Sequence, residues 1–202
     1  MRGPVYVIGW GSLIWDLDDL APKVAGPWRM GAGPSLPLEF SRVSVKRKMG
    51  LAVCIDLDHG APCPTHAIAS RRDDPFAARA DLAARERAPE AMIGVWCARS
   101  GRGEGRSAQQ VGAWCEASGA AGAVWTDVTS NYLDHHGESF SLPHAEAYLQ
   151  GLAGDGRDEA VRYIENAPED TDTPLRRRLS QRLWWREEAA RVARLDASEG
   201  GA

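Results

Sequence analysis

The chain has 202 residues, of which 44% are hydrophobic, and this suffices for one substantial core but is short for two ordinary domains. We therefore expect a single domain over residues 1–202. The formal net charge of −4 at pH 7 gives no general attraction to a phosphate backbone, so nucleic acid is not expected as a partner.

The four cysteines indicate a reducing environment. Their spacing lacks the close pairs of a zinc site, and their density is far below that of a disulfide-rich scaffold. Residues 5–8 have the pattern of a strand and not of an export signal, and no window approaches about 18 consecutive apolar residues. We expect a cytoplasmic protein without membrane contact.

Short strands separated by turn residues are predicted in the first part of the chain. Runs rich in β-branched and aromatic residues predict strands over residues 4–10, 36–45, 51–57 and 65–70. The charged residues 46–50 connect two of these runs, and a solvated hairpin turn explains them better than an anion site does. Two further strands are expected over residues 93–98 and 123–128.

An alanine- and arginine-rich helix is predicted over residues 75–88. An aspartate accepts hydrogen bonds from the free amides of a first helical turn, and proline fits the first helical position, so Asp73-Asp74-Pro75 is a good start. Pro89 marks the end, and Asp81 is expected to pair with Arg85. The expected apolar face consists of Phe76, Ala80, Ala83 and Ala84.

Helical patterns dominate the last third of the chain. One helix is predicted before it, over residues 107–119, and three within it, over residues 143–151, 158–166 and 174–195. The first of these begins with the capping-box spacing at Ser107. In the last, Leu175, Leu179 and Leu183 form a stripe that we expect in the core. Strands followed by helices predict an α+β fold.

Residues 9–13, Gly-Trp-Gly-Ser-Leu, directly follow the first predicted strand. Two glycines around a turn let backbone amides approach a ligand closely, and such a turn can hold an anion. Pattern alone favours a plain structural turn. The longer dinucleotide fingerprint is absent, because Ile14 stands where its third glycine would be, so no nicotinamide cofactor is expected.

Residues 7–15 resemble the N-terminal signature of the γ-glutamylcyclotransferase-like superfamily, particularly its ChaC branch. Residues 82–86, Leu-Ala-Ala-Arg-Glu, resemble the segment that carries the catalytic glutamate there, and Glu86 follows Ser12 by 74 residues. The resemblance covers residues 4–132 and implies a small mixed β-barrel or sheet with flanking helices. Residues 140–195 would form a helical C-terminal extension packed on this core.

The resemblance also implies a reaction, the release of 5-oxoproline from a γ-glutamyl peptide or amine. The α-amine attacks the γ-carbonyl of the same molecule, and Glu86 is the implied general acid and base. The implied substrate-binding residues, acting largely through main-chain amides, are Trp10, Gly11, Ser12 and Leu13. No metal or cofactor is required, and the expected partner is a small γ-glutamyl molecule.

Two departures from the family pattern keep other functions open. Trp10 stands where tyrosine is usual, and residues 87–89, Arg-Ala-Pro, follow Glu86 where the family has a Gly-Gly-Tyr type of segment. One alternative is a non-catalytic small-molecule binding protein on the same fold. Another is an amide hydrolase or amidotransferase that uses Glu86. Without the resemblance, Glu86 would be interpreted as an ordinary solvated side chain.

Other residue groups carry weaker signals. His135 and His136 lie between two acidic residues, but adjacent histidines in a polar loop rarely bind one ion, so a surface loop and no metal are expected. Cys54 and Cys97 fall in predicted strands and are expected to be buried small hydrophobes. Further candidates to line the pocket are Asp127, Ser130, Asn131 and Tyr132.

Overall fold

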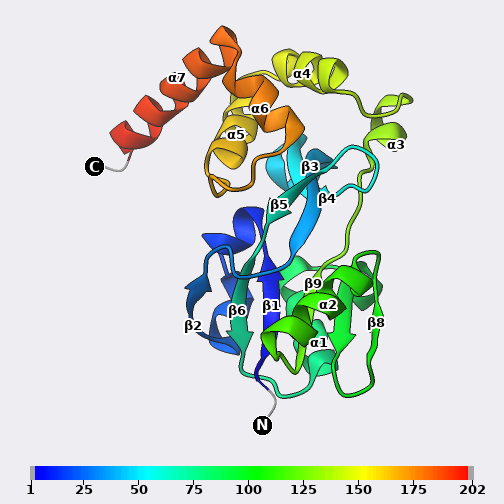
Figure 1. Cartoon of the computed structure of the whole chain (residues 1–202). Coiled ribbons are helices and arrows are strands. Elements are labelled where there is room, and N and C mark those ends of the chain that lie inside the picture. Colours follow the sequence, from blue (N-terminus) through cyan, green and yellow to red (C-terminus); the bar gives the residue numbers. More distant parts are fainter. Residues whose placement is uncertain (1–2, 200–202) are drawn as a thin grey trace. The chain divides into compact units, whose positions relative to one another are not determined.

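A computed structural model describes residues 3–199 and has an α+β fold with helices in its C-terminal part. The chain divides into two compact units (Figure 1). Unit 1 comprises Met1–Leu36 and Pro62–Val128, and unit 2 comprises Pro37–Ala61 and Thr129–Ala202. No helix among the described residues is long and apolar enough to cross a membrane.

Unit 1 is built on a mixed sheet of six strands in the order β2-β6-β1-β9-β7-β8. These strands are β1 (Val5–Gly9), β2 (Val24–Arg29), β6 (His66–Ser70), β7 (Ile93–Cys97), β8 (Arg102–Glu104) and β9 (Gly122–Thr126). Strand β1 lies between β6, to which it is antiparallel, and β9, to which it is parallel.

The sheet of unit 1 is open. Its outer strands β2 and β8 stand at opposite ends of the order, and three other strands form a separate sheet instead of completing the first. The expected barrel is therefore not formed among residues 3–199, whereas the expected mixed sheet with flanking helices is present. Strands β2, β5 and β8 were not predicted, because they are short or contain proline and glycine.

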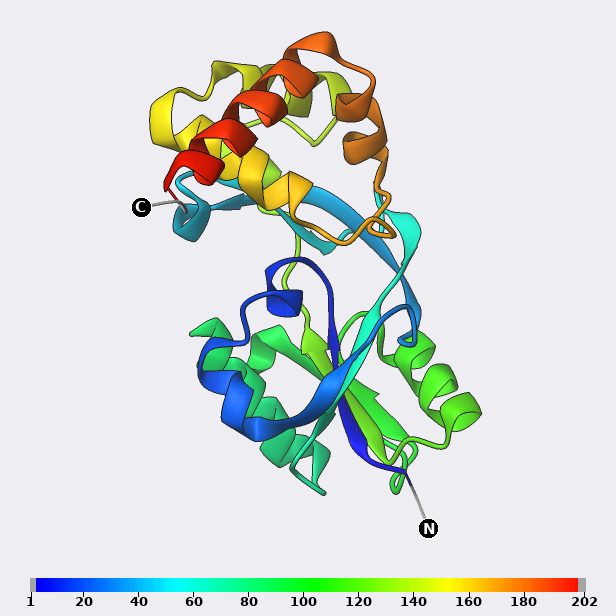
Figure 2. The ribbon, with the colours of Figure 1, turned by 90° about the vertical axis from the view of Figure 1, so that its left-hand side faces the viewer.

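Helices α1 (Pro75–Glu86) and α2 (Ala108–Ser118) cover opposite faces of this sheet (Figure 2). The predicted start of α1 is confirmed, since the Asp74 side chain accepts a hydrogen bond from the Phe76 amide. The helix ends at Glu86, and the residue that follows, Arg87, has a left-handed backbone with φ of 52°. The predicted cap of α2 is wrong, because the Ser107 side chain makes no capping hydrogen bond.

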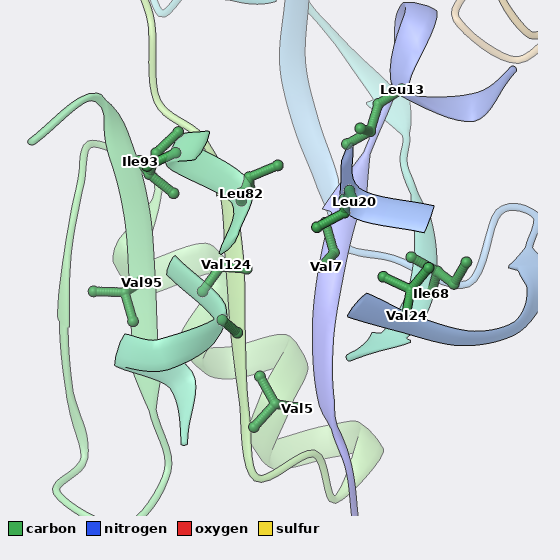
Figure 3. Close-up of a cluster of buried hydrophobic side chains, with 12 residues drawn as sticks. Val5, Val7, Leu13, Leu20, Val24, Ile68, Leu82, Ile93, Val95 and Val124 are labelled. Atoms are coloured by element: carbon green, nitrogen blue, oxygen red, sulfur yellow. The ribbon is translucent and has the colours of Figure 1, made fainter. Parts of the chain in front are cut away.

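The hydrophobic core of unit 1 fills the space between the sheet and α1 (Figure 3). Alternate residues of the central strands, such as Val5 and Val7, point into it together with Leu13 and Leu82. Only Ala83 of the expected apolar face of α1 is buried, because Phe76, Ala80 and Ala84 are exposed. The buried residues of α1 are Pro75, Ala78, Leu82, Ala83 and Arg85.

Unit 2 contains strand β4 and most of strand β3 from a three-stranded antiparallel sheet in the order β4-β3-β5, together with five α-helices among its described residues. The strands are β3 (Ser35–Ser44), β4 (Gly50–Ile55) and β5 (Ala61–Pro64), and the unit boundary passes through β3 and β5. A turn of 3-10 helix, Val45–Arg47, confirms the turn predicted between two strands. The helices are α3 (Tyr132–His136), α4 (Leu142–Gly151), α5 (Gly154–Glu165), α6 (Pro174–Ser180) and α7 (Leu183–Glu199).

The helix predicted over residues 174–195 is two helices. Helix α6 ends at Ser180 and α7 begins at Leu183, which is 64% exposed. Leu175 and Leu179 are buried as expected, but the break turns Leu183 out of their stripe. Neither glycine nor proline marks the break, so the sequence pattern continued across it.

Candidate functional site

The turn after β1 needs its two glycines for different reasons. A Cβ atom at position 9 would lie 2.5 Å from Cη2 of Trp28, so the packed indole excludes any larger residue there. Gly11 has φ of 57°, a conformation that favours glycine. Trp10 between them is extended, and Gly11–Ile14 forms a turn of 3-10 helix. Both glycines are thus explained by packing and backbone geometry.

The four residues predicted to bind substrate are placed differently in this turn. Leu13 is 4% exposed and belongs to the core, and Trp10 is 7% exposed, whereas Ser12 is partly accessible. In a 3-10 helix that starts at Gly11, the N–H groups of Gly11 and Ser12 precede the first helical hydrogen bond and have no carbonyl partner within the helix. Gly11 is itself buried, so Ser12 is the more accessible of these two residues.

Glu86 is the last residue of α1, and its side chain is 23% exposed. Its Oε1 atom accepts a hydrogen bond of 2.8 Å from Nη1 of Arg85. The C-terminal end of a helix is electrically negative because its last carbonyls have no helical partner. The guanidinium of Arg85 supplies the compensating positive charge at this place.

Arg85 links Glu86 to the segment that follows the turn. Its Nη2 atom donates to the carbonyl oxygen of Asp16, four residues after Ser12, and lies 3.9 Å from the Asp16 carboxylate. The Arg85 side chain is only 2% exposed, and its Nε atom has no hydrogen-bond partner among the described residues. One buried guanidinium therefore holds both the Glu86 carboxylate and the main chain beyond the turn.

Two further contacts fasten the end of α1 to the same segment. Leu82 of α1 and Leu13 of the turn belong to one hydrophobic cluster. Beyond Glu86, Nη2 of Arg87 lies 3.3 Å from the Asp18 carboxylate, and both residues have positive φ. Non-glycine residues in this conformation persist where the surroundings hold them, and such positions gather at functional sites.

Sequence reasoning missed the role of Arg85. The expected pair between Asp81 and Arg85 does not form, because Asp81 binds Arg72 instead. In an alanine-rich helix, the apolar face is poorly marked, and an arginine on the helix is assigned to solvent by default. One signal could have indicated its burial. Arg85 follows Leu82 by three residues and Ala78 by seven, a spacing that places all three on the same face of the helix, and both of the others are buried.

The additional pocket candidates are each engaged within their own unit. Asp127 accepts from the Arg106 amide and from the Trp125 indole. Ser130 donates to the carbonyl oxygen of Ser41. Asn131 exchanges two hydrogen bonds with Val43, and Tyr132 is fully buried. None of these contacts adds support for a ligand site.

The histidine pair and the cysteines give a mixed outcome. The expected surface loop is a short helix, α3, in which His135 is exposed while His136 packs on Tyr132. No group of three or more His, Cys, Asp or Glu side chains suited to a metal ion occurs among residues 3–199. Cys54 is buried as expected, and burial raises the pKa of its thiol to about 11, whereas Cys97 is only partly buried.

Glu39 is a second carboxylate that sequence reasoning missed. It is fully buried in β3, where its oxygens accept from the amides of Phe40 and Leu175. Burial raises the pKa of Glu39 to about 7, although hydrogen bonds from Thr173 and the two amides oppose the increase. With 0% exposure it cannot reach a substrate, so we assign it to the packing of β3 against the start of α6.

No known protein family, no curated protein and no solved structure matches this chain.

Proposed function

We propose that the chain is a γ-glutamyl cyclotransferase-like enzyme with Glu86 as its general acid and base. The proposal rests on the resemblance of residues 7–15 and 82–86 to that superfamily. The observation that carries it is the Arg85 guanidinium, which holds the Glu86 carboxylate and the main chain of Asp16 beside the glycine turn. The two segments that carry the resemblance are therefore far apart in the sequence and close together in the fold.

In the proposed reaction, the α-amine of the γ-glutamyl group attacks its own γ-carbonyl carbon. A new carbon–nitrogen bond closes the five-membered ring, and the bond to the attached amine breaks, which yields 5-oxoproline and a free amine. Two protons leave the attacking nitrogen as the α-ammonium group becomes the ring amide. Glu86 takes each in turn and passes it to the leaving nitrogen, which departs as an ammonium ion. Nucleophile and electrophile share one molecule, so the site has only to fold the substrate into a reactive shape.

The turn supplies the binding groups of this proposal. The amides of Gly11 and Ser12 would hold the substrate α-carboxylate or the negative charge that develops on the carbonyl oxygen. Leu13 anchors the turn in the core, which keeps these amides in place. The balance of protons and bonds is complete with Glu86 alone, so the proposed step names no metal or cofactor.

The test is incubation of the pure protein with γ-glutamyl peptides and γ-glutamylamines, with mass spectrometry of the products. The proposal expects 5-oxoproline from wild type and none from Glu86→Gln. Glu90→Gln, an exposed glutamate four residues further on, is the matched control and should retain activity. Free glutamate or a transferred γ-glutamyl group in place of 5-oxoproline would assign the site to a hydrolase or an amidotransferase.

A non-catalytic binding protein is the second candidate, and Trp10 is the observation that favours it. A buried indole replaces the phenolic hydroxyl that the family pattern places in the pocket. This function expects no product from folded wild-type protein, together with saturable binding of 5-oxoproline or a γ-glutamyl compound by calorimetry. Binding that Glu86→Gln leaves unchanged would separate a ligand site from a catalytic one.

A further inference from the structure

Unit 2 contains a cluster of aromatic rings between α3 and α4, which we call the α3–α4 cluster. It consists of Tyr132, His136, Phe140, His144 and Tyr148. The His136 ring centroid lies 4.3 Å from that of Tyr132, 4.4 Å from that of Tyr148 and 5.5 Å from that of His144. His136, which is partly buried, therefore packs against rings of both helices.

Three polar atoms of the cluster are buried without a hydrogen-bond partner among the described residues. They are Oη of Tyr132, Nε2 of His136 and Nδ1 of His144. Tyr132 is 0% exposed. A buried polar atom without a partner costs about 1–3 kcal/mol, and the cost grows when the group is charged. The surroundings of the His136 ring thus favour its neutral form over the charged one.

The ionisable neighbours of His136 add to this preference. Burial lowers the pKa of His136 first, and the positive charges of His144 and His135 lower it further, while Glu138 opposes them. The Glu138 carboxylate lies 3.6 Å from Nδ1 of His144. Tyr132 and Tyr148 face His136 as neutral rings, because burial raises the pKa of both phenols.

The ends of the cluster are anchored, whereas α3 itself is short. Ser130 and Asn131, just before α3, are hydrogen-bonded to Ser41 and Val43 of β3. On α4, the Tyr148 hydroxyl donates to the carbonyl oxygen of Met49. Helix α3 has five residues, and a helix of this length depends on packing for its stability. Loss of the ring contacts would therefore open α3 locally.

We propose that the α3–α4 cluster is an acid-sensitive contact, in which protonation of His136 releases α3 from α4 and uncovers Tyr132. The closed form binds fewer protons than the open form, because His136 recovers its ordinary proton affinity once it is exposed. The contact is therefore fully formed above the ordinary histidine pKa of 6.5 and is lost as the pH falls through the lowered value. Each pKa unit recovered on opening multiplies the opening equilibrium by about ten.

Hydrogen exchange of the full-length protein, followed by mass spectrometry at about pH 7.5 and at about pH 5, tests this proposal. After correction for intrinsic exchange rates, peptides that cover α3 should exchange severalfold faster at the lower pH, while peptides of β1 in unit 1 should not change. Equal protection of α3 at the two pH values would overturn the proposal, and this comparison requires no variant.

Two variants assign the effect to one ring. His136→Phe keeps an aromatic ring but cannot take a proton, so the acid-induced opening of α3 should disappear. His135→Gln is the matched control at the adjacent, exposed histidine, and it should retain most of the opening. Acid-induced opening that persists in folded His136→Phe would overturn the proposal. If this variant does not fold, the imidazole titration of His136 in wild type, measured by NMR, must coincide with the opening.

Discussion

Glu86 in unit 1 and Glu39 in unit 2 each place a carboxylate at a helix end. For Glu86 it is the C-terminal end of its own helix, and for Glu39, a residue of a strand, it is the N-terminal end of a neighbouring helix. Glu86 closes α1, where the helix end is negative, and it binds the cation of Arg85. Glu39 meets the start of α6, where it accepts from the Leu175 amide. The comparison shows that the helix end selects the partner of a carboxylate, a cation at the C-terminal end and main-chain amides at the N-terminal end.

Exposure separates the two glutamates further. The Glu86 side chain is 23% exposed, whereas Glu39 is 0% exposed although its pKa is about 7. A pKa near neutrality is typical of acid-base catalysts, but it also follows from burial alone. Its lack of access to solvent therefore excludes Glu39 from proton transfer to a substrate despite its raised pKa. The following variants test this distinction.

The largest expected effect is that of Glu86→Gln on turnover. Loss of a general acid and base lowers the rate about 10²–10⁴-fold. The free energy of unfolding should change by less than about 1 kcal/mol, because the amide oxygen can still accept from Arg85. Single-turnover formation of 5-oxoproline and urea denaturation measure the two quantities. Wild-type turnover in Glu86→Gln would remove the catalytic role.

Glu39 should instead appear in the pH dependence of stability. A carboxyl with a raised pKa binds its proton more tightly in the folded state, so its stabilisation is complete below 4.5 and is lost as the pH rises through about 7. The loss should be on the order of 3 kcal/mol. Glu39→Gln should flatten this slope in urea denaturation at several pH values. The exposed control Glu169→Gln should keep it, and an unchanged slope in Glu39→Gln would contradict the assignment.

Arg85 and Arg87 flank Glu86 and should differ in their effect on stability. Arg85→Met leaves the Asp16 carbonyl and the Glu86 carboxylate without their donor, so the free energy of unfolding should fall by about 1–3 kcal/mol. Arg87→Ala breaks a pair in which the arginine is 69% exposed, and it should change stability by about 0.5 kcal/mol or less. Equal losses in chemical denaturation would show that burial does not distinguish the two arginines.

The smallest expected effect is a gain in stability. Arg87 ends α1 in the left-handed conformation, which glycine adopts without steric cost. Arg87→Gly should raise the free energy of unfolding by about 1 kcal/mol or less, because relief of this strain exceeds the loss of the Asp18 contact. Thermal unfolding measures the change. A lower melting temperature would mean that the Asp18 contact matters more than the backbone strain.

The sequence predicted many of the elements and few of their contacts. The strands that begin at Val5, Gly50 and Ile93 were recognised from local composition, as was the start of α1 at Pro75. Strand β8 was missed, because its three exposed residues carry no hydrophobic pattern. The pairing of β1 with β9 joins residues more than 100 positions apart, which no local signal specifies.

The sequence by itself determined the features that depend on a few neighbouring residues. The Asp74 cap, the fixed φ of Pro75 and the left-handed glycine at position 11 are examples, since each follows from the conformational limits of one side chain or backbone. The same holds for the presence of Glu86 next to an arginine.

Only the tertiary structure decided what those residues contact. Packing of Leu82 and Leu13 into one core turned Arg85 inward and brought its guanidinium to Asp16, 69 residues away. Packing also set His136 among the rings of α4 and sealed Glu39 beneath α6. Burial and long-range pairing depend on the sum of many weak contacts over the whole chain, so they cannot be derived from the residues on either side.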